Sequence, residues 1–176
     1  MTEYRRAKVG GATWFFTVNC AERRGNRLLV ENIDLLRRVF RKVKNNHPFH
    51  IDAIVVLPDH LHCIWSLPPG DADYKTRWGL IKAGFSRDIP PGERRSRSRI
   101  KRGERGIWQR RYWEHLIRDD RDYQQHIDYI HWNPVKHKWA NRVRDWPHSS
   151  FHMYVRRGIV AADWAGEPDD SLEAGE

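Results

Sequence analysis

Apolar and polar positions alternate in four stretches of the chain, and this pattern predicts β-strands. The stretches are rich in aromatic and β-branched residues and are bounded by turn-forming residues: 12–20, 49–57, 60–67 and 113–118. Pro58 and Asp59 form a tight turn between the second and third stretches. We therefore expect these two strands to pair as a hairpin.

A second periodicity, of about 3.6 residues, predicts three helices. Apolar residues recur at helical spacing from Asn32 to residue 46, from 71 to 89, and from about 119 to Asn133. Pro134 is expected to end the third helix, because proline disfavours helix in the residue before it. The order strand, helix, strand, strand, helix, strand is that of the split βαβ arrangement. We therefore expect an α+β, ferredoxin-like fold, an antiparallel sheet with helices, plus an extra C-terminal helix.

The third predicted strand presents two histidines side by side. Side chains in a strand alternate between faces, so His60 and His62 share one face. The other face is uniformly apolar and is expected to be core: Leu61, Cys63, Trp65 and Leu67. Neutral imidazole is a common ligand of divalent metals, and two neighbouring rings can hold one ion. With ten histidines in the chain, such a pair also arises by chance and does not establish a metal site alone.

The third predicted helix carries a polar flank beside its apolar stripe. The stripe consists of Tyr123, Ile127 and Ile130. At about 100° per residue, His126, Tyr129 and Asn133 gather on an adjacent flank. Because the core stripe does not need Tyr129, we expect this tyrosine to lie beside the domain rather than inside it. His126 is expected to have a core or solvent role.

Charge and composition favour a polyanionic partner. The formal net charge is +9 and the sequence pI is about 9.9. Nine tryptophans would suit stacking on unpaired bases, although most tryptophans lie in cores. Basic residues concentrate in 93–111, a charge run expected to be solvated and mobile, for which we favour DNA or RNA contact over a bare solvated loop. The side chains predicted to bind DNA are Arg94, Arg95, Arg97, Arg99, Lys101, Arg102, Arg105, Arg110 and Arg111.

Other features bound the location and extent of the domain. The two cysteines have no paired spacing, which argues for a reducing cytoplasm and against a disulfide framework or zinc ribbon. No signal peptide is visible, and no apolar run approaches the ~20 residues of a membrane span. We expect a cytoplasmic, nucleoid-associated protein without a membrane partner. Residues 1–158 are predicted to form one domain, and residues 159–176 an acidic, disordered tail.

Four segments in a fixed order carry a resemblance to a known family. They are LPDHLH (57–62), WQRRYWEH (108–115), YIHWNPVK (129–136) and WPHSS (146–150), within a match over roughly residues 10 to 155. They resemble the REP-associated tyrosine transposases, which belong to the single-tyrosine HUH transposases. The resemblance implies that His60 and His62 ligate Mg²⁺ or Mn²⁺, that Asn133 is the third ligand, and that Tyr129 is the nucleophile. It also implies a sequence-specific endonuclease that cleaves and rejoins single-stranded DNA next to REP-type palindromic hairpins through a 5′-phosphotyrosine.

Rival interpretations stay open from the sequence. A catalytically inactive DNA- or RNA-hairpin-binding protein of the same fold would share these segments. A zinc-dependent hydrolase could use His60, His62 and His115 with water as the nucleophile. His131 is a further rival ligand, but it lies about 160° from Asn133 around the helix. We expect a monomer, with a dimer as the alternative, and in a monomer the tyrosine helix must fold back onto its own histidine strand.

Overall fold

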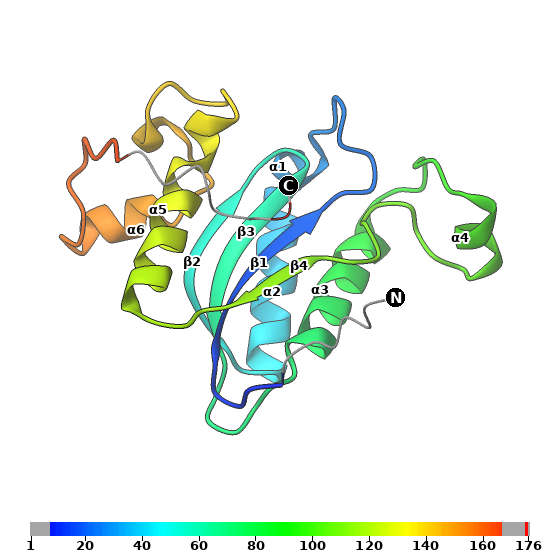
Figure 1. Ribbon diagram of the computed structural model, residues 1–176. Helices are drawn as coiled ribbons and strands as arrows, with labels where there is room; N and C mark the ends of the chain where they lie inside the picture. The colour runs from blue at the N-terminus through cyan, green and yellow to red at the C-terminus, as the bar shows by residue number, and fades with distance from the viewer. Residues whose placement is uncertain (1–7, 167–174, 176) are drawn as a thin grey trace.

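A four-stranded antiparallel sheet forms the centre of the fold in the computed structural model, which describes residues 8–166 and 175 (Figure 1). The strands are β1 (Thr13–Asn19), β2 (His50–Val56), β3 (His60–Ser66) and β4 (Trp113–Leu116). Their order across the sheet is β2-β3-β1-β4, and every neighbouring pair is antiparallel. This order confirms the predicted α+β fold class.

Helices cover both faces of the sheet. They are α1 (Leu28–Glu31), α2 (Ile33–Asn46), α3 (Tyr74–Asp88), α4 (Arg97–Lys101), α5 (Asp120–Lys136), the 3₁₀ turn η1 (Val143–Asp145) and α6 (Phe151–Arg156). Helices α2 and α3 cover one face, and α5 packs over β2 and β3 on the other (Figure 1). The three predicted helices correspond to α2, α3 and α5. The short elements α1, α4, η1 and α6 were not predicted.

The sheet separates two hydrophobic cores. On the α2–α3 side, Trp65 stacks on Trp78 with ring centroids 4.3 Å apart, and the centroid of the Phe49 ring lies 4.2 Å from that of Trp65. Leu61, Cys63 and Leu67 are buried on this side with Trp65, so the predicted core face of the third strand is confirmed. The other face of β3, which carries the two histidines, lies under α5.

The C-terminal end of α5 differs from the sequence prediction. The helix does not stop before Pro134 but runs to Lys136, with the proline in its last turn, where its missing N–H removes at most one helical hydrogen bond. A Schellman motif then ends the helix: the N–H of Lys138 donates to the Val135 carbonyl and that of Trp139 to the Pro134 carbonyl, both at 2.9 Å. Lys138 takes the left-handed position, with a φ of 59°, where glycine is the usual residue.

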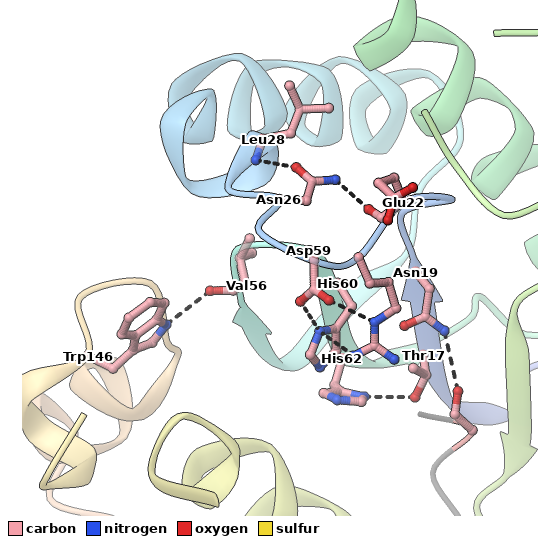
Figure 2. Close-up of polar contacts among 12 residues, drawn as sticks. Thr17, Asn19, Glu22, Asn26, Leu28, Val56, Asp59, His60, His62 and Trp146 are labelled. Carbon is pink, nitrogen blue, oxygen red and sulfur yellow. Dashed lines mark hydrogen bonds and ion pairs between the residues drawn. The ribbon is translucent and has the colours of Figure 1, made fainter. Parts of the chain in front are cut away.

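The segment of residues 146–150 covers the outer edge of β2. The N–H of Val56 donates to the His148 carbonyl at 2.9 Å, and the N–H of Ser150 donates to the Ile54 carbonyl at 2.8 Å. The indole N–H of Trp146 donates to the Val56 carbonyl at 3.0 Å (Figure 2). An edge strand with unpaired backbone groups invites pairing with another chain. This segment therefore has a structural role in closing the sheet.

Part of the predicted disordered tail packs on the domain. Trp164 lies 6.2 Å from the rings of both His131 and Phe151. Residues 167–174 and 176, which include every acidic residue of this predicted tail except Asp163, lie outside the described residues. Within the described part of the chain, no helix combines the length and apolar character needed to cross a membrane.

Candidate metal and tyrosine site

Strand β3 presents His60 and His62 to the α5 face of the sheet, where both side chains are buried. Their ring centroids are 5.0 Å apart, and the planes are nearly perpendicular. His60 Nδ1 lies 2.7 Å from Asp59 Oδ1, and His62 Nδ1 lies 2.7 Å from Thr17 Oγ1 (Figure 2). Because a neighbour holds Nδ1 in each ring, Nε2 is the nitrogen that each histidine can offer to a metal.

Asp59 fixes the protonation of His60. Burial alone would raise the pKa of Asp59, but hydrogen bonds from His60 and Arg23 outweigh it and lower the pKa to about 2. An ionised carboxylate can only accept, so His60 Nδ1 carries the proton. Burial lowers the pKa of His60 even though this carboxylate acts to raise it. The lowered pKa keeps the ring in its neutral, metal-binding form. Its buried Nε2 has no hydrogen-bond partner among the described residues.

One flank of α5 lies opposite the histidine pair. Tyr129, Asn133 and His137 follow each other at intervals of four residues and therefore share this flank. The Tyr129 ring is 5.3 Å from that of His62, and the His137 ring is 5.2 Å from that of His60. Asn133 is fully buried and, by the four-residue spacing, lies one turn from each of Tyr129 and His137 on this flank. The structure thus brings the four predicted site residues together within one chain, with α5 folded back onto its own histidine strand.

Tyr129 is buried, so the prediction that it lies beside the domain is wrong. It is 2% exposed, and its ring packs edge-on against Phe15 at 6.1 Å. The flank is buried as well as the stripe because α5 lies across the sheet and not along its rim. Lys136 Nζ donates to the Tyr129 hydroxyl at 3.3 Å and lies 4.7 Å from the ring centre. An ammonium group in this position stabilises negative charge on the phenol oxygen.

The sequence patterns do not single out four residues that this site contains. They are Thr17, Asp59, Lys136 and His137. Asp59 lies directly before His60, inside a segment that carries the family resemblance, and could have been found there. Lys136 and His137 would have joined the Tyr129 flank had the helix been extended past Pro134. Thr17 has no local signal, since only the pairing of β1 with β3 places it opposite His62.

His115 belongs to a different cluster from the histidine pair. His115, Asp122 and His126 form the one group of three His, Cys, Asp or Glu residues in the described chain whose possible ligand atoms lie within 4.8 Å of one another. The Phe15 ring contacts both His126, at 4.6 Å, and His62, at 5.7 Å, and so lies between the two clusters. This placement does not favour a hydrolase site built from His60, His62 and His115.

The contacts within this cluster serve the fold. Asp122 accepts from His115 Nε2 at 2.8 Å and from the N–H of Arg118 at 2.9 Å. His126 Nδ1 donates to the Asp122 carbonyl oxygen at 2.8 Å. The group therefore fastens β4 to the first turn of α5. His131, the other rival ligand, lies 3.2 Å from Ser150 Oγ, among the residues that cover β2.

Acidification is expected to destabilise the protein through Asp122. Burial alone would raise the pKa of this carboxyl, but hydrogen bonds from His115 and Arg118 outweigh it and lower the pKa from 3.8 to about 2. A carboxyl whose pKa is lower in the folded than in the unfolded state stabilises the fold at pH values above its unfolded-state pKa. This stabilisation is lost as the pH falls from about 4 through 2. The loss is on the order of 2 kcal/mol. Urea unfolding at pH 6, 4 and 2 measures it.

Asp122→Asn should be less stable at pH 6 and show a smaller loss between pH 4 and 2. Asp34→Asn, which removes an exposed carboxyl on α2, is the matched control and should behave as the wild type. An unchanged pH dependence in Asp122→Asn would contradict the assignment.

The basic segment 93–111 is held by its own contacts. Arg105 Nη2 lies 2.9 Å from Glu93 Oε2, and Arg105 Nη1 donates to the Ser86 carbonyl at 2.7 Å. Arg99 donates to the carbonyls of Arg105 and Trp108 at 2.8 and 3.0 Å. The segment includes α4 and projects away from the sheet on the side opposite α5 (Figure 1). Arg99 and Arg105 therefore hydrogen-bond within this part of the chain and are not fully solvated.

The other basic residues of this segment are exposed: Arg94, Arg95, Arg97, Lys101, Arg102, Arg110 and Arg111. Arg110 also pairs with Glu104 at 2.7 Å. Contact with DNA stays a prediction for all nine, and the exposed side chains are the better placed for it.

Comparison with known proteins finds relatives over the full chain. No family model matches. A REP-associated tyrosine transposase of Escherichia coli (strain K12) is 48% identical over 176 residues, covering 100% of this chain and 98% of the relative. A Haemophilus influenzae protein assigned to the same family is 43% identical over 170 residues and covers 96% of both chains. A solved structure, described as a REP-associated tyrosine transposase bound to a REP hairpin, matches with a TM-score of 0.85 at 48% identity, over 100% of this chain and 98% of that one.

Proposed function

The chain belongs to the REP-associated tyrosine transposases, and we propose that it binds a REP-type hairpin and cleaves and rejoins the adjoining single strand of DNA. The observation that carries the proposal is the placement of Tyr129 beside His62, at 5.3 Å between rings, within one chain. A relative with 48% identity is described as bound to a REP hairpin, which supports the same partner here. Since tyrosine and histidines come from one chain, a monomer suffices.

We further propose that one Mg²⁺ or Mn²⁺ binds at Nε2 of His60 and His62, with the side-chain oxygen of Asn133 as the third ligand. The donor set supports this, because both rings have Nδ1 held by a neighbour and His60 Nε2 is buried without a hydrogen-bond partner among the described residues. When bound, the cation would supply Lewis-acid neutralisation of phosphate charge. Imidazole and amide ligands leave the charge of the cation largely intact for this purpose.

The proposed reaction transfers the strand to Tyr129. The phenol oxygen attacks phosphorus, a P–O bond to tyrosine forms, and the bond from phosphorus to the 3′ oxygen breaks. The phenol proton ends on the leaving 3′ oxygen, so the products are a 5′-phosphotyrosine and a free 3′-OH. Tyrosine is a weak nucleophile at its ordinary pKa of about 10. The Lys136 ammonium, 3.3 Å from the hydroxyl, assists by stabilising the phenolate.

The covalent intermediate also makes the reaction reversible. The phosphotyrosine keeps the energy of the broken phosphodiester, so a 3′-OH can attack it and rejoin a strand without ATP. This property distinguishes a strand transferase from a hydrolase, which releases the bond energy to water.

A gel assay tests the proposed function. Labelled hairpin DNA with its single-stranded arms, taken from the source genome, is incubated with the protein and Mn²⁺ or EDTA and separated under denaturing conditions. We expect a covalent protein–DNA band with Mn²⁺ that is absent with EDTA. Tight hairpin binding without a band would identify an inactive hairpin-binding protein of this fold. Cleavage without a band would identify water as the nucleophile.

Neutralising the exposed charges around α4 is expected to weaken hairpin binding and flatten its salt dependence. Each lost phosphate contact lowers the slope of log affinity against log salt by about 0.9 for a duplex. The variant replaces Arg94, Arg95, Arg97, Lys101 and Arg102 with glutamine and spares the structural Arg99 and Arg105. Fluorescence anisotropy of labelled hairpin DNA measures this slope between about 50 and 300 mM salt, a range that includes physiological ionic strength.

The control variant removes the same number of charges from α2, at Arg37, Arg38, Arg41, Lys42 and Lys44. We expect it to keep the wild-type slope. Equal slopes in all three proteins would show that the α4 segment does not contact the hairpin phosphates.

A further inference from the structure

A cavity of about 320 Å³ opens beside His60, and Tyr129 is not among its lining residues. Its principal lining side chains are Arg23, Arg27, Asp59, His60, His137 and Trp139. This volume is at the lower end of the range found for small-molecule sites. Because His60 is a wall of the cavity and a proposed metal ligand, anything bound here adjoins the proposed reaction centre.

Trp139 forms an aromatic wall of this cavity and is 43% exposed, whereas seven of the nine tryptophans of the chain are buried or half-buried. The ring is held in place by its backbone, since the two Schellman hydrogen bonds fix the turn that carries it. Lys138 holds the left-handed φ of 59° that this turn requires. A strained residue that places an exposed indole beside a reaction centre is typical of a binding site.

The charges around the cavity are unevenly distributed. At its base, Arg23 Nε pairs with Asp59 Oδ2 at 2.7 Å, so these two charges compensate each other. At its rim, the Arg27 guanidinium lies 5.7 Å from the centre of the Trp139 ring, and its 3.7 Å contact with Glu31 is solvent-exposed. The floor of the cavity carries paired charges, one wall is aromatic and the rim is positively charged. Such a cavity suits a flat, uncharged ring with a phosphate attached.

We propose that this cavity, the Trp139 pocket, holds the base of the unpaired nucleotide next to the cleaved phosphate, stacked on the Trp139 indole. Arg27 contacts that nucleotide's phosphate at the rim. The inference rests on the proposed function, because it requires the single strand to pass His60. Trp139 is thereby a positioning residue, which sets where the strand lies relative to Tyr129 and takes no part in bond breaking.

Abasic scanning of the single-stranded arm tests the pocket. The hairpin DNA carries its natural arm, and each arm nucleotide in turn is replaced by an abasic site. In wild type, an abasic site at one position should weaken binding by about 5- to 150-fold, the range for loss of one base–aromatic stack. Trp139→Ala should bind the intact arm more weakly than wild type by the same factor. An abasic site at that position should cause no further loss of affinity in this variant.

Two variants control for indirect effects. Trp139→Tyr keeps an aromatic face and should restore most of the abasic penalty. Trp113→Ala removes the other exposed tryptophan, 38% exposed on β4, and should keep the full penalty at that position. If the penalty persists unchanged in Trp139→Ala, the base does not stack on this ring and the inference is wrong.

A second probe separates failure of the pocket from failure of the proposed function. Fluorescein-labelled hexathymidylate contains no hairpin and no cleavage site, and its anisotropy reports single-strand binding alone. We expect its affinity to fall in Trp139→Ala and recover in Trp139→Tyr, even if no covalent adduct ever forms. Equal affinity for wild type and Trp139→Ala would overturn the pocket while leaving hairpin binding and adduct formation as separate measurements.

Discussion

Replacing Tyr129 with phenylalanine is expected to abolish the covalent protein–DNA adduct and strand cleavage together, by at least about a thousandfold. The substitution removes the only atom that would become bonded to phosphorus and leaves the ring that packs on Phe15 and His62. The fold should lose about 1 kcal/mol with the Lys136 hydrogen bond. Hairpin affinity should change by less than about twofold, since the substitution removes a single hydroxyl from a residue that is only 2% exposed.

Single-turnover cleavage of labelled hairpin DNA with Mn²⁺ measures this prediction. Tyr123→Phe is the matched control, because Tyr123 lies on the same helix and its hydroxyl donates to Asp52 at 3.2 Å. That variant should cleave and form adduct as the wild type does. Cleavage that survives in Tyr129→Phe would mean that water, and not this phenol, attacks the phosphate.

The strands and long helices could be predicted because their signals are local. Alternation in β3 separates the faces correctly, with the histidine pair on one and the Trp65 core on the other. Periodicity identifies α2, α3 and α5 because each has at least three turns of apolar spacing. The elements α1, α4 and α6 have 4, 5 and 6 residues, which is too short for a helical period to show.

The site could be predicted only in part, because its shape depends on contacts between distant elements. The burial of Tyr129 follows from how α5 crosses the sheet, and the periodicity of the helix sequence does not reveal this placement. The hydrogen bond from Thr17 to the His62 ring follows from the β1–β3 register. Pro134 gives a misleading local signal, because its restriction of the preceding residue is a preference that packing overrides in the last turn of a helix.

The histidine pair is expected to account for all specific metal binding. His60→Ala should abolish stoichiometric Mn²⁺ binding in calorimetry, and adduct formation with it, because one imidazole and one amide are too few ligands for tight binding.

Asn133→Ala should weaken Mn²⁺ binding while hairpin affinity in EDTA stays unchanged. Asp59→Asn should weaken Mn²⁺ affinity by about 10- to 100-fold, the usual effect of losing the partner that orients a ligating histidine.

The decisive control is the other histidine cluster. His115, Asp122 and His126 also bring three possible ligand atoms within 4.8 Å, but hydrogen bonds inside the fold already use the Asp122 carboxylate. His115→Ala should therefore lower stability and leave Mn²⁺ binding intact. If Mn²⁺ binding is lost in His115→Ala and kept in His60→Ala, the metal lies in this cluster, and the tyrosine beside His62 must act without a metal at its own site.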